Sequence, residues 1–405
     1  MVPTATPQAV QLQNSDAWPH FLGPRRDGSA PSARIAVWPQ DGPTVRWRRD
    51  VGEGFAGPAA TAEQLLLFHR VADQEVLESL DAATGRPMWT ASYATSYRDD
   101  FGFDEGPRAT PTIAQGRVFT FGAQGKLQAV DLASGQVLWS VDTHARFGVR
   151  KGFFGAAAAP LVDGDRVLLN VGGRGAGIVA FDTASGEVLW TATDDEASYS
   201  APVTAELAGR HSALFFTRNG LLEIDPASGQ VRADYAWRSR SRSSVNAATP
   251  LVIGQRVYLS ASYGTGAVLL QRGDDGFTPV WSSDDVLTNH YATSVHHRGY
   301  LYGFHGRQEY GQSLRAVELS SGNVAWEIER FGAGTLFIVG ERLLILRERG
   351  ELVLSEATPE AFRPLASARI LGGTVRAYPA LANHLLFARN GTELVAVELP
   401  TPPSS

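Results

Sequence analysis

The stretch VDLASGQVLW, residues 130–139, recurs along the chain and decides its architecture. Close copies are LDAATGRPMW at 80–89 and FDTASGEVLW at 181–190, and a weaker copy is ELSSGNVAW at 318–326. Each copy predicts a strand, a tight turn at Ser/Thr-Gly, and a second strand that carries Trp. Gly supplies the positive φ that such a turn needs, and the Asp and Ser/Thr side chains bond the turn backbone. A spacing of about 50 residues indicates an array of four-stranded units.

Two markers each count eight units. The first is the Trp of the last strand, which occurs at Trp47, Trp89, Trp139, Trp190, Trp281 and Trp326. The longest interval hides one unit, which IDPASGQ at 224–230 supplies with Ala233 in the Trp position. A degenerate unit that ends near residues 362–364 brings this count to eight. The second marker is a small residue plus Pro at the start of each first strand, found at Pro58, Pro111, Pro160, Pro202, Pro250 and Pro379, with Ser294 and Thr335 in the two gaps.

The two ends of the array complete each other. The last unit stops at Leu399 without a Trp strand, whereas residues 44–50 form a Trp strand that no unit precedes. The N-terminal strand therefore closes the last blade and removes an open sheet edge. We predict an all-β fold, a single eight-bladed β-propeller over residues 44–400. Residues 17–43, rich in Pro and Gly, are expected to form a strap packed on the propeller, residues 1–16 a disordered linker, and 401–405 a tail.

Composition excludes several classes of function. Lys and Arg number 36 against 42 Asp and Glu, a balance that argues against nucleic acid as a partner. The chain has no Cys, which excludes disulfides, thiolate nucleophiles and Cys-ligated metal clusters. No apolar run approaches about 18 residues, so we expect no membrane-spanning helix.

The pattern Ala/Val-x-Asp-x-x-Ser/Thr-Gly-x-x-x-Trp resembles the pyrroloquinoline-quinone-type propeller repeat. That repeat occurs in quinoprotein alcohol dehydrogenases and in the outer-membrane β-barrel assembly lipoprotein. The segment WPHFLGPRRDG at 18–28 resembles the opening of a group of exported bacterial proteins with this repeat. The resemblance implies that each framework Trp docks on the neighbouring blade. It also implies an exported, periplasmic protein whose signal peptide is not part of this chain, and we expect a monomer.

The long loops indicate where a binding surface lies. In a propeller, the first strand of each blade begins and the second ends on one face. The loops at 93–108, 141–155, 190–199, 237–246 and 283–291 lie on this face, and the short Ser/Thr-Gly turns lie on the other. Because long loops carry function more often than short ones, we expect the working surface there. The candidate ligand-binding residues around its mouth are Phe55, His69, Asp104, Arg108, Arg150, Phe154, Tyr199, Arg242, Asn246, His290, Tyr291, His305 and Arg376.

These residue types leave alternatives open. Arg beside aromatic residues suits the binding of anions, sugars or peptides. The alternative is that the Arg side chains pair with carboxylates inside a polar channel and bind no ligand. The basic run around Arg242 either holds a phosphate, sulfate or carboxylate, or pairs with Asp104 and Glu105. His290 and His305 would give two ligands, whereas catalytic zinc has three protein ligands, so no metal site is expected. GGRGAG at 172–177 joins two strands and is interpreted as a hairpin rather than a phosphate loop.

No catalytic residue follows from the sequence. Quinoprotein dehydrogenases that resemble this repeat use an adjacent Cys pair and a set of carboxylates and amides around calcium. This chain has no Cys and no assignable set, so no cofactor is expected and pyrroloquinoline quinone with calcium is disfavoured. The first hypothesis is a scaffold that binds a protein partner or a small polar or anionic ligand. The alternatives are an enzyme acting on a sugar or other polar metabolite at the mouth, and a quinone-dependent dehydrogenase.

Overall fold

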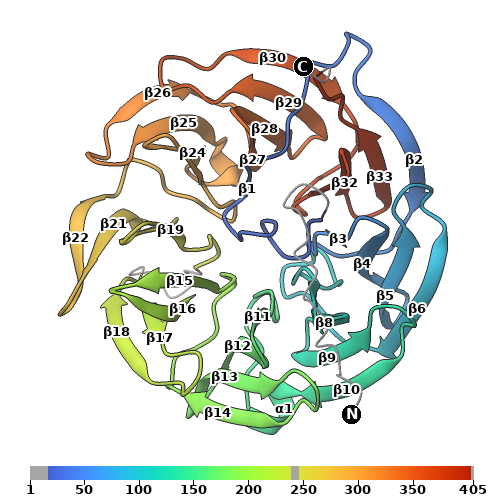
Figure 1. The fold of residues 1–405 in the computed structure, drawn as a ribbon, viewed down its shortest axis with the longest axis vertical. Coiled ribbons are helices and arrows are strands. Elements are labelled where there is room, and N and C mark those ends of the chain that lie inside the picture. Colours follow the sequence, from blue (N-terminus) through green and yellow to red (C-terminus); the bar gives the residue numbers. More distant parts are fainter. Residues whose placement is uncertain (1–16, 239–245, 403–405) are drawn as a thin grey trace, which may run out of the picture.

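A computed structural model describes residues 17–238 and 246–402 and contains eight sheets arranged in a ring (Figure 1). Seven are four-stranded and antiparallel, and one has the same four-stranded blade with β1 added in parallel as a fifth strand. The predicted linker at 1–16, Arg242 and the last three residues of the predicted tail lie outside the described residues. The eight-bladed propeller predicted from the sequence is confirmed. Each blade runs from a short inner strand to an outer strand.

The strands of the first four blades follow in chain order. Blade 1 comprises β3 (Ala59–Ala60), β4 (Gln64–Val71), β5 (Gln74–Asp81) and β6 (Pro87–Ala94). Blade 2 comprises β7 (Thr112–Ala114), β8 (Arg117–Phe121), β9 (Lys126–Asp131) and β10 (Val137–Asp142). Blade 3 comprises β11 (Leu161–Asp163), β12 (Arg166–Gly173), β13 (Ala176–Asp182) and β14 (Val188–Ala192). Blade 4 comprises β15 (Val203–Leu207), β16 (Arg210–Phe216), β17 (Gly220–Ile224) and β18 (Val231–Ala236).

The remaining blades repeat this order until the ring closes. Blade 5 comprises β19 (Leu251–Ile253), β20 (Arg256–Ala261), β21 (Gly266–Gly273) and β22 (Gly276–Ser283). Blade 6 comprises β23 (Val295–His297), β24 (Tyr300–His305), β25 (Ser313–Glu318) and β26 (Val324–Ile328). Blade 7 comprises β27 (Gly334–Val339), β28 (Arg342–Arg347), β29 (Glu351–Glu356) and β30 (Pro364–Arg369). Blade 8 comprises β31 (Ala380–Ala382), β32 (Leu385–Arg389), β33 (Glu393–Glu398) and β2 (Thr44–Asp50).

The closure of the ring follows the prediction. Strand β2 pairs antiparallel with β33, from Thr44 opposite Glu398 to Asp50 opposite Glu393. The first strand of the propeller is thus the outer strand of its last blade. The exposed edge of β33 is thereby removed, and chain segments far apart in sequence hold the ring shut.

The recurring motif fastens each blade to the next. The indole N–H of every framework Trp donates to a backbone oxygen in the connection between the third and fourth strands of the following blade. The pairs are Trp47 with Ala82, Trp89 with Leu132, Trp139 with Thr183, Trp190 with Pro226, Trp281 with Leu319 and Trp326 with Thr358. An indole buries roughly 150–250 Å², so each contact is a substantial part of the interface between two blades.

The turn glycine of the motif has a steric role as well as a conformational one. Gly135 has a φ of 75°, and a β-carbon there would lie 2.6 Å from the Trp89 indole of the previous blade. Gly186 meets Trp139 in the same way, also at 2.6 Å. Any larger residue would therefore both strain the turn and push the indole out of its seat.

Two polar bonds shape the motif turn at residues 131–135. The Asp131 carboxylate accepts the Ser134 amide at 2.8 Å and the Ser134 hydroxyl at 2.6 Å. These bonds lower the pKa of Asp131, the hydroxyl bond contributing most. The turn is thus held by its own side chains, so the residues that form it can be recognised in the sequence.

The segment 17–43 crosses the centre of the ring (Figure 1). Trp18 pairs with Ala60 at the end of β3, and β1 (Ser29–Ala30) pairs in parallel with the end of β27. The buried Arg26 guanidinium donates to the Pro160 carbonyl at 3.0 Å, and burial lowers its pKa to about 9. The segment therefore joins blades on several sides of the axis.

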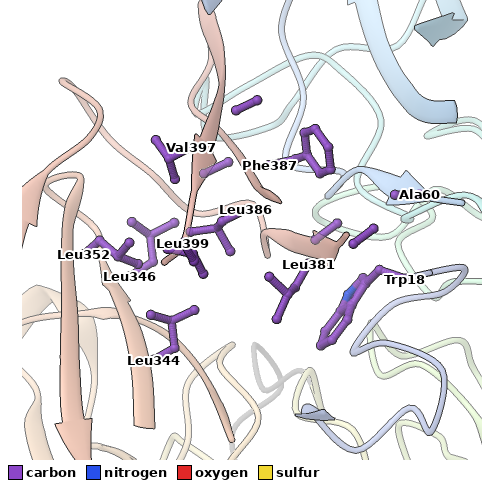
Figure 2. Packing of buried hydrophobic residues seen from close by; sticks show 14 of the residues in the cluster. Trp18, Ala60, Leu344, Leu346, Leu352, Leu381, Leu386, Phe387, Val397 and Leu399 are labelled. Carbon is purple, nitrogen blue, oxygen red and sulfur yellow. The ribbon is translucent and has the colours of Figure 1, made fainter. Parts of the chain in front are cut away.

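The seam between the last and first blades carries the largest apolar cluster. This cluster combines Trp18 and Trp38 of the strap with core residues of blades 1, 7 and 8. Figure 2 shows the Trp18 indole beside Leu381 and Ala60. Trp18 and Trp38 are 2% and 3% exposed, so the strap adds apolar burial where the chain is not continuous.

Helical structure is confined to loops. A short helix, α1 (Thr143–Phe147), lies in the loop after blade 2, and a 3₁₀ turn, η1 (Gln308–Tyr310), lies between β24 and β25. The Asp142 carboxylate caps α1 by accepting the Ala145 amide at 2.9 Å, and Gly148 ends it with a φ of 61°. In the part of the chain that is described, no helix has the length and apolar character to cross a membrane.

Candidate functional site

The structure brings four of the predicted residues together at the axis. Arg108, Tyr199, Tyr291 and Arg376 line a central cavity of about 130 Å³. The Phe21 side chain of the strap is part of its lining and contacts the Tyr378 ring edge-on, with centroids 4.9 Å apart. The cavity is smaller than the roughly 300–1,000 Å³ of ordinary ligand pockets. Its size therefore does not favour the hypothesis of an enzyme acting at the central mouth.

Both arginines of the axial cavity already have carboxylate partners. The Arg376 guanidinium donates to Glu348 at 2.7 Å. The Arg108 guanidinium lies 3.5 Å from the Asp99 carboxylate, whose side chain is fully buried. These pairs agree with the interpretation that Arg and carboxylate side chains pair with each other inside a polar channel, rather than with the one in which Arg binds a ligand.

Phe55 lies between the two arginines. Its ring centroid is 5.6 Å from the Arg108 guanidinium and 5.6 Å from that of Arg376. Arg376 also stacks over Phe103 at 5.5 Å. A guanidinium over a ring contributes about 0.5–2 kcal/mol, so the mouth is held together by alternating cations and rings.

The axial tyrosines remain protonated. Burial raises the pKa of Tyr199 and of Tyr291 above the usual range. The Tyr199 hydroxyl accepts the Phe154 amide at 3.0 Å, and the Phe154 ring packs against the Tyr199 ring at 5.6 Å. Phe154 thus lies beside the axial residues without lining their cavity.

Three of the predicted residues are structural rather than exposed at the mouth: His69, Asn246 and Asp104. His69 is buried, its Nδ1 accepting the Gly52 amide at 2.9 Å, and its Nε2 lies 3.4 Å from Glu78. The Asn246 amide donates to the Thr217 carbonyl at 2.7 Å. None of this group lines the central cavity, because the side chains already satisfy buried backbone groups.

Asp104 also serves the backbone. Its carboxylate accepts the Gly54 amide at 2.9 Å and the Gly106 amide at 2.7 Å. The neighbouring Glu105 pairs with Arg98 at 2.8 Å. Arg150 lies away from the axis, in a second cavity described below.

The two histidines that the sequence placed at the mouth have separate surroundings. His290 contacts the Tyr263 hydroxyl at 3.1 Å, whereas His305 accepts the Thr288 amide at 3.2 Å. Burial is the main cause of a lowered pKa in both rings. Within residues 17–238 and 246–402, no three His, Cys, Asp or Glu side chains form a group that could hold a metal ion.

The axial cavity does not fit a calcium–quinone pair. Calcium takes about 6–8 oxygen ligands and prefers carboxylates. The described lining of the cavity contains Arg, Tyr, Phe, Thr and Ala, with no carboxylate or carboxamide side chain. The two candidate oxygen ligands for calcium, Asp104 and Asn246, form hydrogen bonds with backbone groups instead.

Sequence reasoning missed an aromatic patch on the long-loop face, formed by Phe101, Phe103, Phe153 and Phe154. The Phe101 ring lies 6.1 Å from Phe103, 6.2 Å from Phe153 and 5.2 Å from Phe154. Phe101 and Phe103 are each 56% exposed. The available signal was the pair of Phe residues in an otherwise polar loop, DDFGFDEG at 99–106.

Comparison with known proteins gives one family. The family described as outer membrane protein assembly factor BamB matches residues 72–328, more than half of the chain. BamB of Moranella endobia is 25% identical over 260 residues, 60% of this chain and 63% of that protein. BamB of Shewanella oneidensis is 28% identical over 271 residues, 61% of this chain and 63% of that protein. The match thus spans less than two thirds of the length of either relative.

Solved structures share the fold. BamB from Moraxella catarrhalis superposes with a TM-score of 0.62 at 16% identity, covering 89% of this chain and 99% of that one. A europium-containing methanol dehydrogenase superposes with a TM-score of 0.69 at 11% identity, covering 94% and 89%. At such identities the likeness concerns the propeller alone, and the pyrroloquinoline-quinone-type architecture is confirmed.

Proposed function

Because the chain belongs to the family of the outer membrane protein assembly factor BamB, we propose that it is a protein-binding propeller scaffold. Its partner docks on the long-loop face, over the aromatic patch and the adjoining mouth. The proposal includes an exported location, as the family description implies, a monomeric chain, and no requirement for a quinone. The fold serves as a rigid ring that presents loops.

The observation that carries the proposal is the aromatic patch. Two stacked phenylalanines stand 56% exposed on a loop whose other residues are polar. Large apolar side chains exposed in groups indicate interaction sites, and interface centres are enriched in aromatic residues and Arg. Arg376, 5.5 Å from Phe103, extends the patch toward the axis.

The loop that carries the patch is anchored from below. The buried Asp99 carboxylate accepts the Phe103 amide at 2.9 Å and the Phe101 amide at 3.3 Å. Asp99 also lies 3.5 Å from the Arg108 guanidinium. A preorganised aromatic loop loses less conformational entropy on binding than a free one, which favours a docking role.

The test begins with a photoreactive amino acid at position 103 in the native host, with position 189 as control. Leu189 is 46% exposed but lies at the start of β14, toward the opposite face. We expect a defined protein adduct from position 103 that position 189 does not give. Identical adducts from the two positions would contradict docking on the long-loop face.

The identified partner then allows a quantitative test with purified proteins. The double substitution Phe101→Ala and Phe103→Ala should weaken binding at least tenfold, because central aromatic residues dominate interface energies. The matched control, Leu138→Ala with Leu189→Ala, removes two exposed apolar side chains elsewhere and should leave the affinity within about twofold. Equal affinity of the patch variant and the unaltered protein, measured by calorimetry, would refute the proposal.

A further inference from the structure

A second cavity, about 460 Å³ in volume, lies off the axis among the long loops of blades 2, 3 and 4. Its volume is within the roughly 300–1,000 Å³ of small-molecule sites. Part of its lining is apolar, including the buried Phe121 and Val171. Tyr199 and Ala157 line both this cavity and the axial one, so the two cavities adjoin.

Glycines shape one wall of this inter-blade cavity. A β-carbon at Gly172 would lie 2.5 Å from the Ala197 amide nitrogen, and one at Gly177 would lie 2.4 Å from the Thr193 hydroxyl oxygen. The β12–β13 hairpin can therefore press against residues 193–198 only because side chains are absent there. The segment GGRGAG is the hairpin predicted from the sequence, and its first glycine, Gly172, also lines the cavity.

The charged groups around the cavity are unequal in sign. Arg150, Lys151, Arg174 and Arg218 contribute to the lining, against the carboxylates of Asp194 and Glu196. Lys151 donates to the Asp100 carboxylate, and Arg218 pairs with Glu196 at 3.1 Å. The Asp194 carboxylate accepts the Gly175 amide at 2.6 Å.

The two remaining arginines have no such partner. Among the residues that the structure describes, Arg150 and Arg174 form no ion pair, side-chain hydrogen bond or ring contact. Arg150 follows α1 and Arg174 is at the tip of the β12–β13 hairpin, so they come from different blades. A guanidinium matches the planar oxygen pairs of carboxylates and phosphates, and two of them confer strong selectivity for an anion.

A neutral donor completes the set. The Tyr199 hydroxyl accepts the Phe154 amide at 3.0 Å, which leaves its own proton available. Burial raises the pKa of Tyr199, so the hydroxyl keeps that proton at neutral pH. The cavity thus combines two unpaired cations, a hydroxyl donor and an apolar floor.

We propose that the inter-blade cavity binds a small organic anion, with Arg150 and Arg174 pairing with its phosphate or carboxylate oxygens and the apolar floor contacting its body. The site adjoins the aromatic patch through the contact of Phe154 with Tyr199, but none of the four patch phenylalanines lines the cavity. It is independent of the proposed docking of a protein partner, and either proposal can fail alone.

The test uses the purified full chain and four probes: inorganic phosphate, a hexose phosphate, citrate and the free hexose. Calorimetry at low ionic strength should give saturable binding of the hexose phosphate or citrate with a dissociation constant below about 1 mM. The free hexose should not bind. Preference between the two organic anions distinguishes a phosphate ligand from a carboxylate ligand, and inorganic phosphate reports on the charged group without the body.

A charge-matched pair of variants separates a site from general attraction. Arg150→Gln with Arg174→Gln should weaken the binding at least tenfold. Arg298→Gln with Arg363→Gln removes the same charge from exposed positions outside the lining and should change it less than twofold. The proposal is overturned if no organic anion binds saturably up to about 10 mM, or if both double variants lose affinity equally.

Discussion

The axial cavity and the inter-blade cavity differ in size and in the state of their charges. The axial cavity measures about 130 Å³, and its arginines pair with Glu348 and Asp99. The inter-blade cavity measures about 460 Å³, and two of its arginines have no partner among the described residues. The axial cavity is small and its charges are paired, as in a structural core. The inter-blade cavity has the volume and the unpaired charge of a binding site.

Symmetry explains the contrast. At the axis, residues that precede the first strands of several blades converge and the strap contributes Phe21, so side chains fill the space and the arginines pair with carboxylates. The off-axis cavity arises where the regular repeat is interrupted by α1 and the Gly-rich hairpin. Departure from the repeat, rather than the repeat itself, produces unoccupied volume with unpaired charge.

The largest expected effect comes from removing the indole that packs the strap against the seam of blades 1, 7 and 8. Trp18→Ala removes an indole that is 2% exposed and meets the Phe337 ring edge-on, with centroids 4.9 Å apart. The free energy of unfolding should fall by about 3–5 kcal/mol, from lost burial and the cavity left behind. Urea unfolding monitored by circular dichroism measures the loss.

The control for this substitution lies in the same strap. Val37→Ala alters a side chain that is 48% exposed and should change the stability by less than about 0.5 kcal/mol. If both variants were equally stable, the strap would contribute nothing to the closure of the ring.

An intermediate effect is expected from filling the wall of the inter-blade cavity. Gly172→Val places a branched side chain at a φ of 84°, against the Ala197 backbone. The free energy of unfolding should fall by about 1–3 kcal/mol. Binding of the hexose phosphate should weaken at least tenfold, because residues 193–198 must move away from the hairpin.

Gly175→Ala is the matched control on the same hairpin. Gly175 also has a positive φ, 67°, but a β-carbon there meets nothing within 4 Å. It should cost only about 1 kcal/mol of backbone strain and leave anion binding intact. Loss of binding in both variants would show that hairpin conformation, not the approach of Ala197, controls the cavity.

The smallest effect concerns the pH dependence of the strap. Burial, reinforced by the Arg26 guanidinium, holds the pKa of His20 well below its usual value. Below about pH 6.5 the unfolded chain binds this proton and the folded chain does not, so stability falls as the pH drops. His20→Gln should make the decrease in urea midpoint between about pH 7 and pH 5 shallower.

His211 supplies the opposite sign. Hydrogen bonding to Asp163, at 2.7 Å, is the main cause of its raised pKa, so it contributes stability at acidic pH that is lost as the pH rises through its folded pKa. His211→Gln should therefore make the acid decrease steeper. The change should stay below about 1 kcal/mol, since the ring is half-exposed. Equal slopes in all three proteins would contradict both assignments.

The fold was predictable because the motif is local. Asp131, Ser134 and Gly135 define their turn by themselves, and each Trp has its partner in the next repeat. The closure by residues 44–50 followed from counting units. Helix α1 was not expected, because a helix of five residues is too short to show a helical pattern of apolar residues in the sequence.

The site was predictable only in part. Because they precede the first strands of their blades, four residues were expected around the central mouth, and they do line one cavity: Arg108, Tyr199, Tyr291 and Arg376. Chain position did not reveal that Asn246 and His69 serve backbone groups. Chain position fixes which face a residue approaches, but its hydrogen-bond partner comes from a different blade or from the strap.

By itself, the sequence determined the number of blades, the fastening of each to the next, and the strand that closes the ring. These depend on contacts within one repeat or between adjacent repeats, so a periodic pattern records them. Only the tertiary structure decided which arginines are neutralised, where volume remains, and that Phe101 and Phe103 stand exposed together. Those properties depend on the meeting of irregular loops from separate blades, and no local pattern encodes such a meeting.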